Sequence, residues 1–200
     1  FAQLQLSGYN YRKFTGELNP RSLQETPEKY DPIFKVSTVN IEENGPGAKG
    51  GSYIPYVVPP GYIRDVDVTT QNQIALNEQS MSLCVDDLHD GDARAVFKNS
   101  TFDFINYKNL KMFVHLESPD DVDKQVSAFL RLGTDNTDNY YEVEMVGLKQ
   151  TKQGQSQASE VWPKENEFNV SFETLKKVKI QRDQAIKSLI ELFTAPQLVK

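Results

Sequence analysis

The sequence predicts a mainly β protein, an antiparallel β-sandwich of the jelly-roll kind with a helix near its C-terminal end. Three observations lead to this prediction. Short runs of alternating apolar and polar residues follow one another from Ser80 to Ser171, polar turn residues separate these runs, and helical spacing appears only after Ser171. Short strands at regular spacing, with turns between them, are typical of packed antiparallel sheets.

Residues 1–52 are expected to belong to the same domain as the sandwich. Alternation predicts strands at 1–6 and 33–41, and the glycine-rich segment 42–51 is expected to form a loop. The next segment, 53–64, contains Pro55, Pro59 and Pro60. Because proline cannot donate a ladder hydrogen bond, we expect this segment to be an extended edge or a surface crossing.

The predicted sandwich core covers residues 53–171. Its expected strands are 80–86, 93–98, 109–117, 124–132, 139–149 and 167–171, with no helix between them. Within this region, residues 129–144 contain two alternating runs around a polar turn, a pattern typical of a β-hairpin.

Residues 172–200 are expected to form a helix or a linker. Ser171 can cap the helix, Glu173 and Lys177 are spaced for an i,i+4 ion pair, and Pro196 should end it. The apolar positions at helical spacing are Phe172, Leu175, Val178, the stem of Arg182, Ala185, Ile186, Leu189, Ile190 and Phe193. This helix either packs on the sandwich or leads into a further domain of a longer protein.

The composition argues against nucleic acid and membrane-spanning roles. The net charge is −6 and the pI is near 5.0, whereas nucleic-acid binding requires a clustered basic surface. No run of about 18 apolar residues is present, so no transmembrane helix is expected, and we interpret the chain as water-soluble. It begins at Phe1 without an initiator methionine, as expected of a piece of a longer protein.

The residues that most often carry chemistry lack suitable neighbours. Cys84 is the sole cysteine, which excludes an internal disulfide and a thiolate zinc site, and we expect it to be a small buried residue. His115 lies on a predicted strand without an accompanying nucleophile motif, so a structural or surface role is expected. The sequence therefore predicts no catalytic residue and no cofactor-binding residue.

Asp135, Asp138 and Glu142 surround the predicted hairpin turn, and carboxylates at a turn suit calcium. They lack the spacing and the glycine of an EF-hand, and Asp and Asn are ordinary turn residues. We expect turn chemistry here and no bound metal, with calcium as the weaker alternative.

Three aromatic residues, Tyr140, Tyr141 and Trp162, are candidates for a flat platform on which a sugar stacks. Aromatic residues in strands more often pack against neighbouring strands. Packing is therefore the favoured interpretation, and sugar contact stays open as an alternative.

Seven short segments carry a resemblance to a known family. Three lie close together: Arg-Leu-Gly-Thr-Asp at 131–135, Asn-Tyr-Tyr-Glu-Val-Glu at 139–144 and Trp-Pro-Lys-Glu-Asn at 162–166. The others are Tyr-Val-Val-Pro-Pro-Gly at 56–61 with Arg64, Asn-Glu-Gln-Ser-Met-Ser-Leu at 77–83, Asp-Ala-Arg-Ala-Val-Phe-Lys at 92–98 and Tyr-Lys-Asn-Leu-Lys-Met-Phe-Val-His at 107–115. Taken in their order along the chain, the seven segments resemble the SprA family, also called Sov, of giant gliding-motility and secretion proteins of the Bacteroidetes. The resemblance spans roughly residues 50–182 and departs at Gly147-Leu148, where the family pattern has Pro-Leu.

The resemblance implies a soluble domain of an outer-membrane translocon for type IX secretion and gliding motility, with no catalytic residues. Its implied partners are other parts of the translocon, other secretion components and secreted proteins. The implied location is the outer membrane or cell surface, with the extracellular and periplasmic sides both open. A carbohydrate-binding module of a cell-surface protein is the alternative function, and a calcium-dependent hydrolase is a more distant one.

Overall fold

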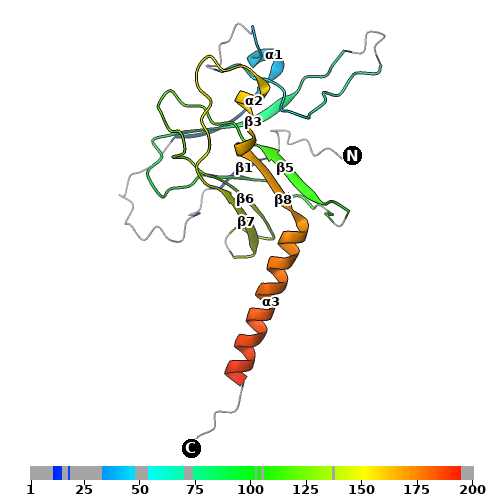
Figure 1. Cartoon of the computed structure of the whole chain (residues 1–200), viewed down its shortest axis with the longest axis vertical. Helices are drawn as coiled ribbons and strands as arrows, with labels where there is room; N and C mark the ends of the chain where they lie inside the picture. The colour runs from blue at the N-terminus through cyan, green and yellow to red at the C-terminus, as the bar shows by residue number, and fades with distance from the viewer. Residues whose placement is uncertain are drawn as a thin grey trace, which may run out of the picture.

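The computed structural model describes residues 11–14, 18, 33–47, 54–69, 74–101, 103–104, 106–136 and 138–194, with side chains up to residue 190. Its strands form four antiparallel pairs (Figure 1): β1 (Arg12–Lys13) with β4 (Val96–Phe97), β2 (Ile33–Asn40) with β3 (Gln79–Asp86), β5 (Asn109–Phe113) with β8 (Glu167–Ser171), and β6 (Ala128–Gly133) with β7 (Tyr140–Met145). The predicted class, mainly antiparallel β with a C-terminal helix, is confirmed. The strands lie in small two-stranded sheets, and the jelly-roll arrangement stays a prediction.

The strand pairs join both near and distant parts of the chain. The predicted hairpin is formed by β6 and β7, with Arg131 opposite Glu142. The other two long pairs connect segments far apart in sequence, since Ile33 lies opposite Asp86 and Asn109 lies opposite Ser171. Alternation locates a strand but carries no information on such distant pairing. The predicted strand at 1–6 and the predicted helix end at Pro196 lie outside the described residues.

Short helices occur where the sequence predicted none. Helix α1 (Ile41–Asn44) follows β2 directly, because the Asn40 side chain accepts hydrogen bonds from the backbone of Glu42 and Glu43 at 3.0 and 2.8 Å. Helix α2 (Ala158–Val161) and the 3-10 helix η2 (Lys164–Asn166) lie between β7 and β8. The expectation that no helix lies between the strands of residues 80–171 was therefore wrong at α2 and η2. At α2 the Glu160 side chain caps the helix by accepting a hydrogen bond from the Gln157 N–H at 3.1 Å.

The hydrophobic core lies where the proline-rich segment meets α2. It consists of Ile54, Tyr56, Val161 and Trp162, with Val39, Ile41, Val57 and Phe113 packed against it. Prolines keep residues 54–65 out of regular strands, as expected, but the prediction of an edge or a surface crossing was wrong for Ile54 and Tyr56, which are buried. Extended backbone can enter a core when its polar groups find partners, and here the Tyr56 N–H donates to the carbonyl of Asn44 at 2.8 Å.

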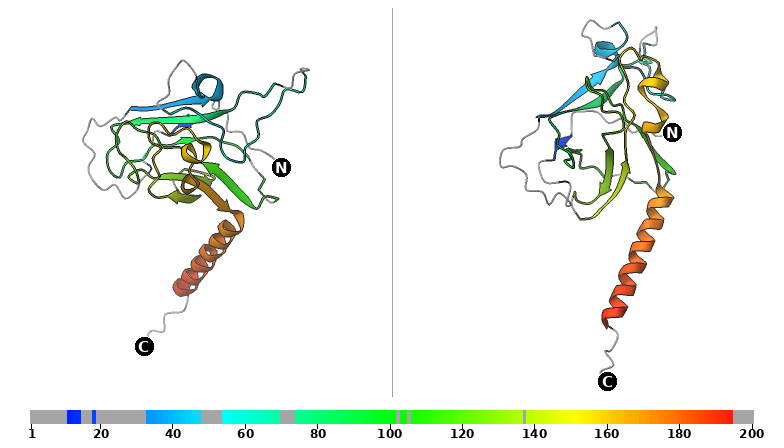
Figure 2. Two further views of the ribbon diagram at one scale, coloured as in Figure 1. Left: turned by 45° about the horizontal axis from the view of Figure 1, so that its top comes forward. Right: turned by 60° about the vertical axis from the view of Figure 1, so that its left-hand side comes forward.

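Helix α3 (Phe172–Thr194) starts immediately after β8 and projects away from the body (Figures 1 and 2). The predicted ion pair between Glu173 and Lys177 forms at 2.9 Å. Five apolar side chains of the helix are 47–56% exposed: Val178, Ile180, Ile186, Leu189 and Ile190. No described helix is both long enough and apolar enough to cross a membrane.

Candidate functional site

Arg131 organises the β6–β7 hairpin that the sequence singled out. Its guanidinium donates to Glu142 at 2.6 Å and to the backbone carbonyls of Asn136 and Leu18, both at 2.9 Å. It also lies over the ring of Tyr140, 4.3 Å from the ring centre. Arginine suits this position because its planar fork of donors serves several acceptors while its face stacks on an aromatic ring. The family-like segment around Arg131 therefore stabilises the hairpin.

Asp135 holds the hairpin turn closed. One of its carboxylate oxygens accepts from the backbone N–H groups of Asp138 and Asn139 at 2.7 and 2.9 Å, and the other accepts from the Asn139 side chain at 2.6 Å. These are the contacts of an Asx-type turn. Glu142, the third calcium candidate, is paired with Arg131 instead. Within the described ranges, no cluster of three or more His, Cys, Asp or Glu side chains is arranged to hold a metal.

The three aromatic candidates differ in their surroundings. Tyr140 and Tyr141 are half-buried on β7, and Tyr140 stacks under Arg131. Trp162 is only 6% exposed, packs against Tyr56, and donates its ring N–H to the Val57 carbonyl at 2.7 Å. The structure places the Trp162 ring in the core beside Tyr56.

His115 and Cys84 have opposite environments. His115 is partly buried, with its Nδ1 2.8 Å from the Val161 carbonyl and its ring edge-on to Trp162. This is a structural position. Cys84 is exposed on β3, opposite Lys35, so the expectation of a buried thiol was wrong. The second half of β3, from Leu83 to Asp86, is exposed, and alternation alone does not reveal which half of a strand is buried.

Asn166 is a buried residue whose importance the sequence reasoning missed. It is 0% exposed, and its side-chain amide accepts from the Lys149 N–H at 2.9 Å and donates to the Lys149 carbonyl at 2.8 Å. This side chain acts as a short substitute for a neighbouring strand. Its position at the end of the Trp-Pro-Lys-Glu-Asn segment was the available indication.

Glu78 and Tyr56 form a second buried polar contact. The Tyr56 hydroxyl donates to Glu78 Oε1 at 2.6 Å, and it lies 2.8 Å from the Ser80 hydroxyl. Glu78 Oε2 is buried without a hydrogen-bond partner in the described part of the chain. Burial raises the pKa of Glu78, and burial together with the nearby Glu78 raises the pKa of Tyr56. The pair sits beside the core, where the unpaired oxygen destabilises the ionised form.

A projecting ribbon carries five exposed apolar side chains. Figure 2 shows this ribbon projecting from the body. We call residues 62–69 and 74–76 the apolar arm, and its two sides are joined by a β-bridge between Val66 and Ala75. Its exposed apolar side chains are Ile63 (83%), Val66 (41%), Val68 (84%), Ile74 (60%) and Leu76 (49%). Arg64 fixes the base of the arm by donating to the carbonyls of Ala75 and Leu76. The arm is an exposed surface of the kind that marks interaction sites.

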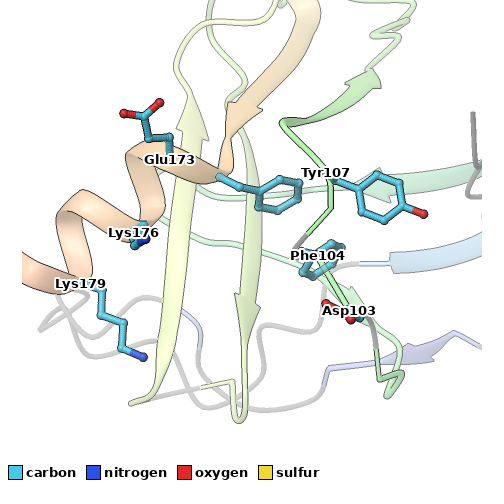
Figure 3. A pocket seen from close by; sticks show the side chains of 7 residues that line it. Asp103, Phe104, Tyr107, Glu173, Lys176 and Lys179 are labelled. Carbon is cyan, nitrogen blue, oxygen red and sulfur yellow. The ribbon is translucent and has the colours of Figure 1, made fainter.

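A groove of about 700 Å³ lies between the start of α3 and the loop before β5 (Figure 3). The rings of Phe104 and Phe172 stack within it with centres 4.8 Å apart. Asp103, Tyr107, Glu173, Lys176 and Lys179 complete its lining. The groove therefore combines an aromatic floor with charged side chains at its rim.

Comparison with known proteins gives one clear result. Residues 1–198 match the model of a family described as motility related/secretion protein, the model for the N-terminal part of SprA. The match covers nearly the whole chain and agrees with the resemblance carried by the seven segments. A search of curated proteins found no match.

Proposed function

The chain belongs to the SprA N-terminal family of motility-related and secretion proteins, and from this premise we propose that it is a non-enzymatic structural and contact domain of an outer-membrane translocon. In this proposal the translocon serves type IX secretion and gliding motility. The domain binds other parts of the translocon, other secretion components or secreted proteins, and lies at the outer membrane or cell surface.

The apolar arm is the observation that most favours a contact function. Single exposed apolar residues are normal on protein surfaces, but a narrow ribbon with five of them is not. Full burial of one such side chain contributes about 1.5–3 kcal/mol. An arm that inserts into a partner therefore gains substantial binding energy from side chains that do little for the fold.

The engagement of the chemically versatile side chains favours a non-enzymatic role. Arg131 holds the hairpin, His115 contacts the Val161 carbonyl beside the core, and Glu78 bonds to Tyr56. A catalytic group must reach a substrate, whereas these groups are committed to internal contacts. The proposal assigns them to maintaining the shape that presents the arm.

The proposal can be tested in cells with two matched substitutions. Val68 on the arm is 84% exposed and Val146, which follows β7, is 77% exposed, so glutamate at either position should leave the fold intact. We expect Val68→Glu to reduce export of secreted proteins and Val146→Glu to leave export unchanged.

Removal of residues 80–171 from the parent protein should block export altogether. Normal secretion after this deletion would sink the proposal. If, in addition, the purified chain retained glycans on an array through Tyr141, the carbohydrate-binding alternative would take its place.

A further inference from the structure

The two sides of the apolar arm are joined by backbone hydrogen bonds that fix which groups point inward. The Asp67 N–H donates to the Ile74 carbonyl at 2.9 Å, and the Leu76 N–H donates to the Asp65 carbonyl at 2.7 Å. These bonds flank the β-bridge in the pattern of an antiparallel ladder. The backbone groups of Asp65 and Asp67 that form them therefore face the other side of the arm.

One edge of the arm carries unpaired backbone groups. Because alternate residues of a strand direct their N–H and C=O groups to opposite edges, those of Arg64 and Val66 point outward. Within the described residues, these main-chain groups form no hydrogen bond. On the other side of the arm, the Arg64 guanidinium takes the carbonyls of Ala75 and Leu76 at 3.1 and 2.7 Å. We call the outward side of residues 63–67 the open edge.

The side chains along the open edge divide between two faces. By alternation, Val66 lies on one face, and Ile63, Asp65 and Asp67 lie on the other. Ile63 is 83% exposed, Val66 is 41% exposed, and Asp65 is exposed as well. Hydrogen bonds from Thr69 lower the pKa of Asp67, so this carboxylate is ionised at neutral pH. A strand beside the open edge therefore meets an apolar face and an acidic face.

We propose that the open edge pairs with an extended antiparallel strand of a partner protein, with basic residues opposite Asp65 and Asp67 and an apolar residue opposite Val66. The pairing rests on the proposed contact function and specifies how the arm binds. In this mode of recognition, main-chain hydrogen bonds supply affinity and alternate side chains supply specificity. The arm projects from the body, so its edge can be approached by a strand (Figure 2).

Two other occupants fit the observations less well. Antiparallel pairing with the arm of a second copy, centred on Val66, places Asp65 directly opposite the Asp67 of that copy, and like charges in this position are destabilising. A bilayer would have to take up both carboxylates, and the connecting residues 69–73, Thr-Thr-Gln-Asn-Gln, are polar as well. A strand with basic residues on one face meets neither obstacle.

The test measures binding of a synthetic probe to the purified 200-residue chain by fluorescence anisotropy. The probe is a labelled peptide of about ten residues in which Val and Lys alternate, and the comparison peptide has Glu in place of every Lys. We expect the basic peptide to bind, more weakly as salt rises, and the acidic peptide not to bind.

Two modified probes test whether the backbone of the peptide pairs with the arm. One carries N-methyl groups on two central Val residues, and the other carries them on two central Lys residues. With Val opposite Val66, the Val N–H groups face the open edge and the Lys N–H groups face away from it. Methylation of the Val residues should therefore abolish binding, whereas methylation of the Lys residues should largely preserve it.

Matched variants locate the binding site. Asp65→Lys should weaken binding of the basic peptide about tenfold and strengthen binding of the acidic peptide, while the Asp65 carbonyl still bonds to Leu76. Asp121→Lys makes the same charge change at another exposed position and should have little effect. Circular dichroism of each variant checks that the fold is retained.

Four results overturn the inference: no binding of the basic peptide, equal binding of the acidic peptide, equal losses with the two methylated probes, or equal effects of Asp65→Lys and Asp121→Lys. Dimerisation lost in Val66→Glu would overturn it in favour of a second copy, and binding to phosphatidylcholine vesicles lost in Ile63→Glu would do so in favour of a bilayer.

The peptide test and the secretion test on Val68 can fail separately. Absence of peptide binding together with impaired export for Val68→Glu rejects strand pairing and leaves the contact function standing. Peptide binding together with normal export for Val68→Glu supports strand pairing and counts against the contact function of the arm in secretion.

Discussion

The segment from Trp162 to Asn166 and helix α3 are separated only by β8, yet they differ in nearly every physical respect. Trp162 is 6% exposed and Asn166 is 0% exposed, and both use their side-chain polar groups within the fold. On α3, by contrast, Ile186 and Leu189 are about half exposed at 47% and 53%. The comparison teaches that the first segment specifies the fold, whereas the second presents a surface, and the two roles predict different responses to mutation.

The largest expected effect is at the core tryptophan. Trp162→Ala should lower the free energy of unfolding by about 3–5 kcal/mol, because it leaves a cavity beside Tyr56 and removes the bond to the Val57 carbonyl. Chemical denaturation monitored by circular dichroism measures the loss. Leu189→Ala is the control on α3 and should change stability by less than about 0.5 kcal/mol. Equal losses for the two variants would remove the distinction between the regions.

A second large effect is expected at the buried asparagine. Asn166→Ala should cost about 2–4 kcal/mol, since it leaves both the N–H and the carbonyl of Lys149 without their partner. The matched control is Asn169→Ala on β8, where the side chain is exposed and its bond is to Asn109. The control should stay within about 0.5 kcal/mol of the unmodified protein. If urea midpoints of the two variants coincide, the role given to Asn166 is wrong.

The sequence predicted the parts of this fold that depend on local pattern. The β6–β7 hairpin, the Glu173–Lys177 pair and the Asp135 turn all follow from residues close together in the chain. The core could not be predicted from local pattern, because burial of Ile54 and Tyr56 depends on contact with Trp162, which is more than 100 residues away in the chain.

Exposure was equally hard to predict from pattern. Cys84 lies in an alternating strand that looks half-buried in sequence, but its end of the β2–β3 pair is exposed. The groove was also missed, since it forms where Phe104 meets Phe172 from separate segments. The residues that maintain the fold and those that form its exposed surfaces are distinguished only by long-range packing.

The pH dependence of stability tests the role of a further buried residue, Glu78. Burial raises its pKa above the ordinary value of 4.5, so the ionised form is less stable in the folded state than in the unfolded state. Its contribution to stability is therefore largest in acid, falls as the pH rises from about 4.5 through the raised pKa, and is constant above that. Relative to Glu78→Gln, the unmodified protein should lose stability over this range. A difference between the two that is flat, or that increases with pH, contradicts this assignment.

The smallest effect on stability is expected on α3. This prediction is the most stringent test of the contrast between the buried segment 162–166 and the exposed helix. Leu189→Gln replaces a side chain that is 53% exposed, so the free energy of unfolding of the purified chain should change by less than about 0.5 kcal/mol. If α3 presents a contact surface, the same substitution should still impair secretion in cells, because a polar group is then buried against a partner. Thr174→Gln, at an exposed position two residues into the helix, is the control for the helix itself. Normal secretion with Leu189→Gln would mean that Leu189 has no role in binding, and a large loss of stability would mean that Leu189 belongs to the fold instead.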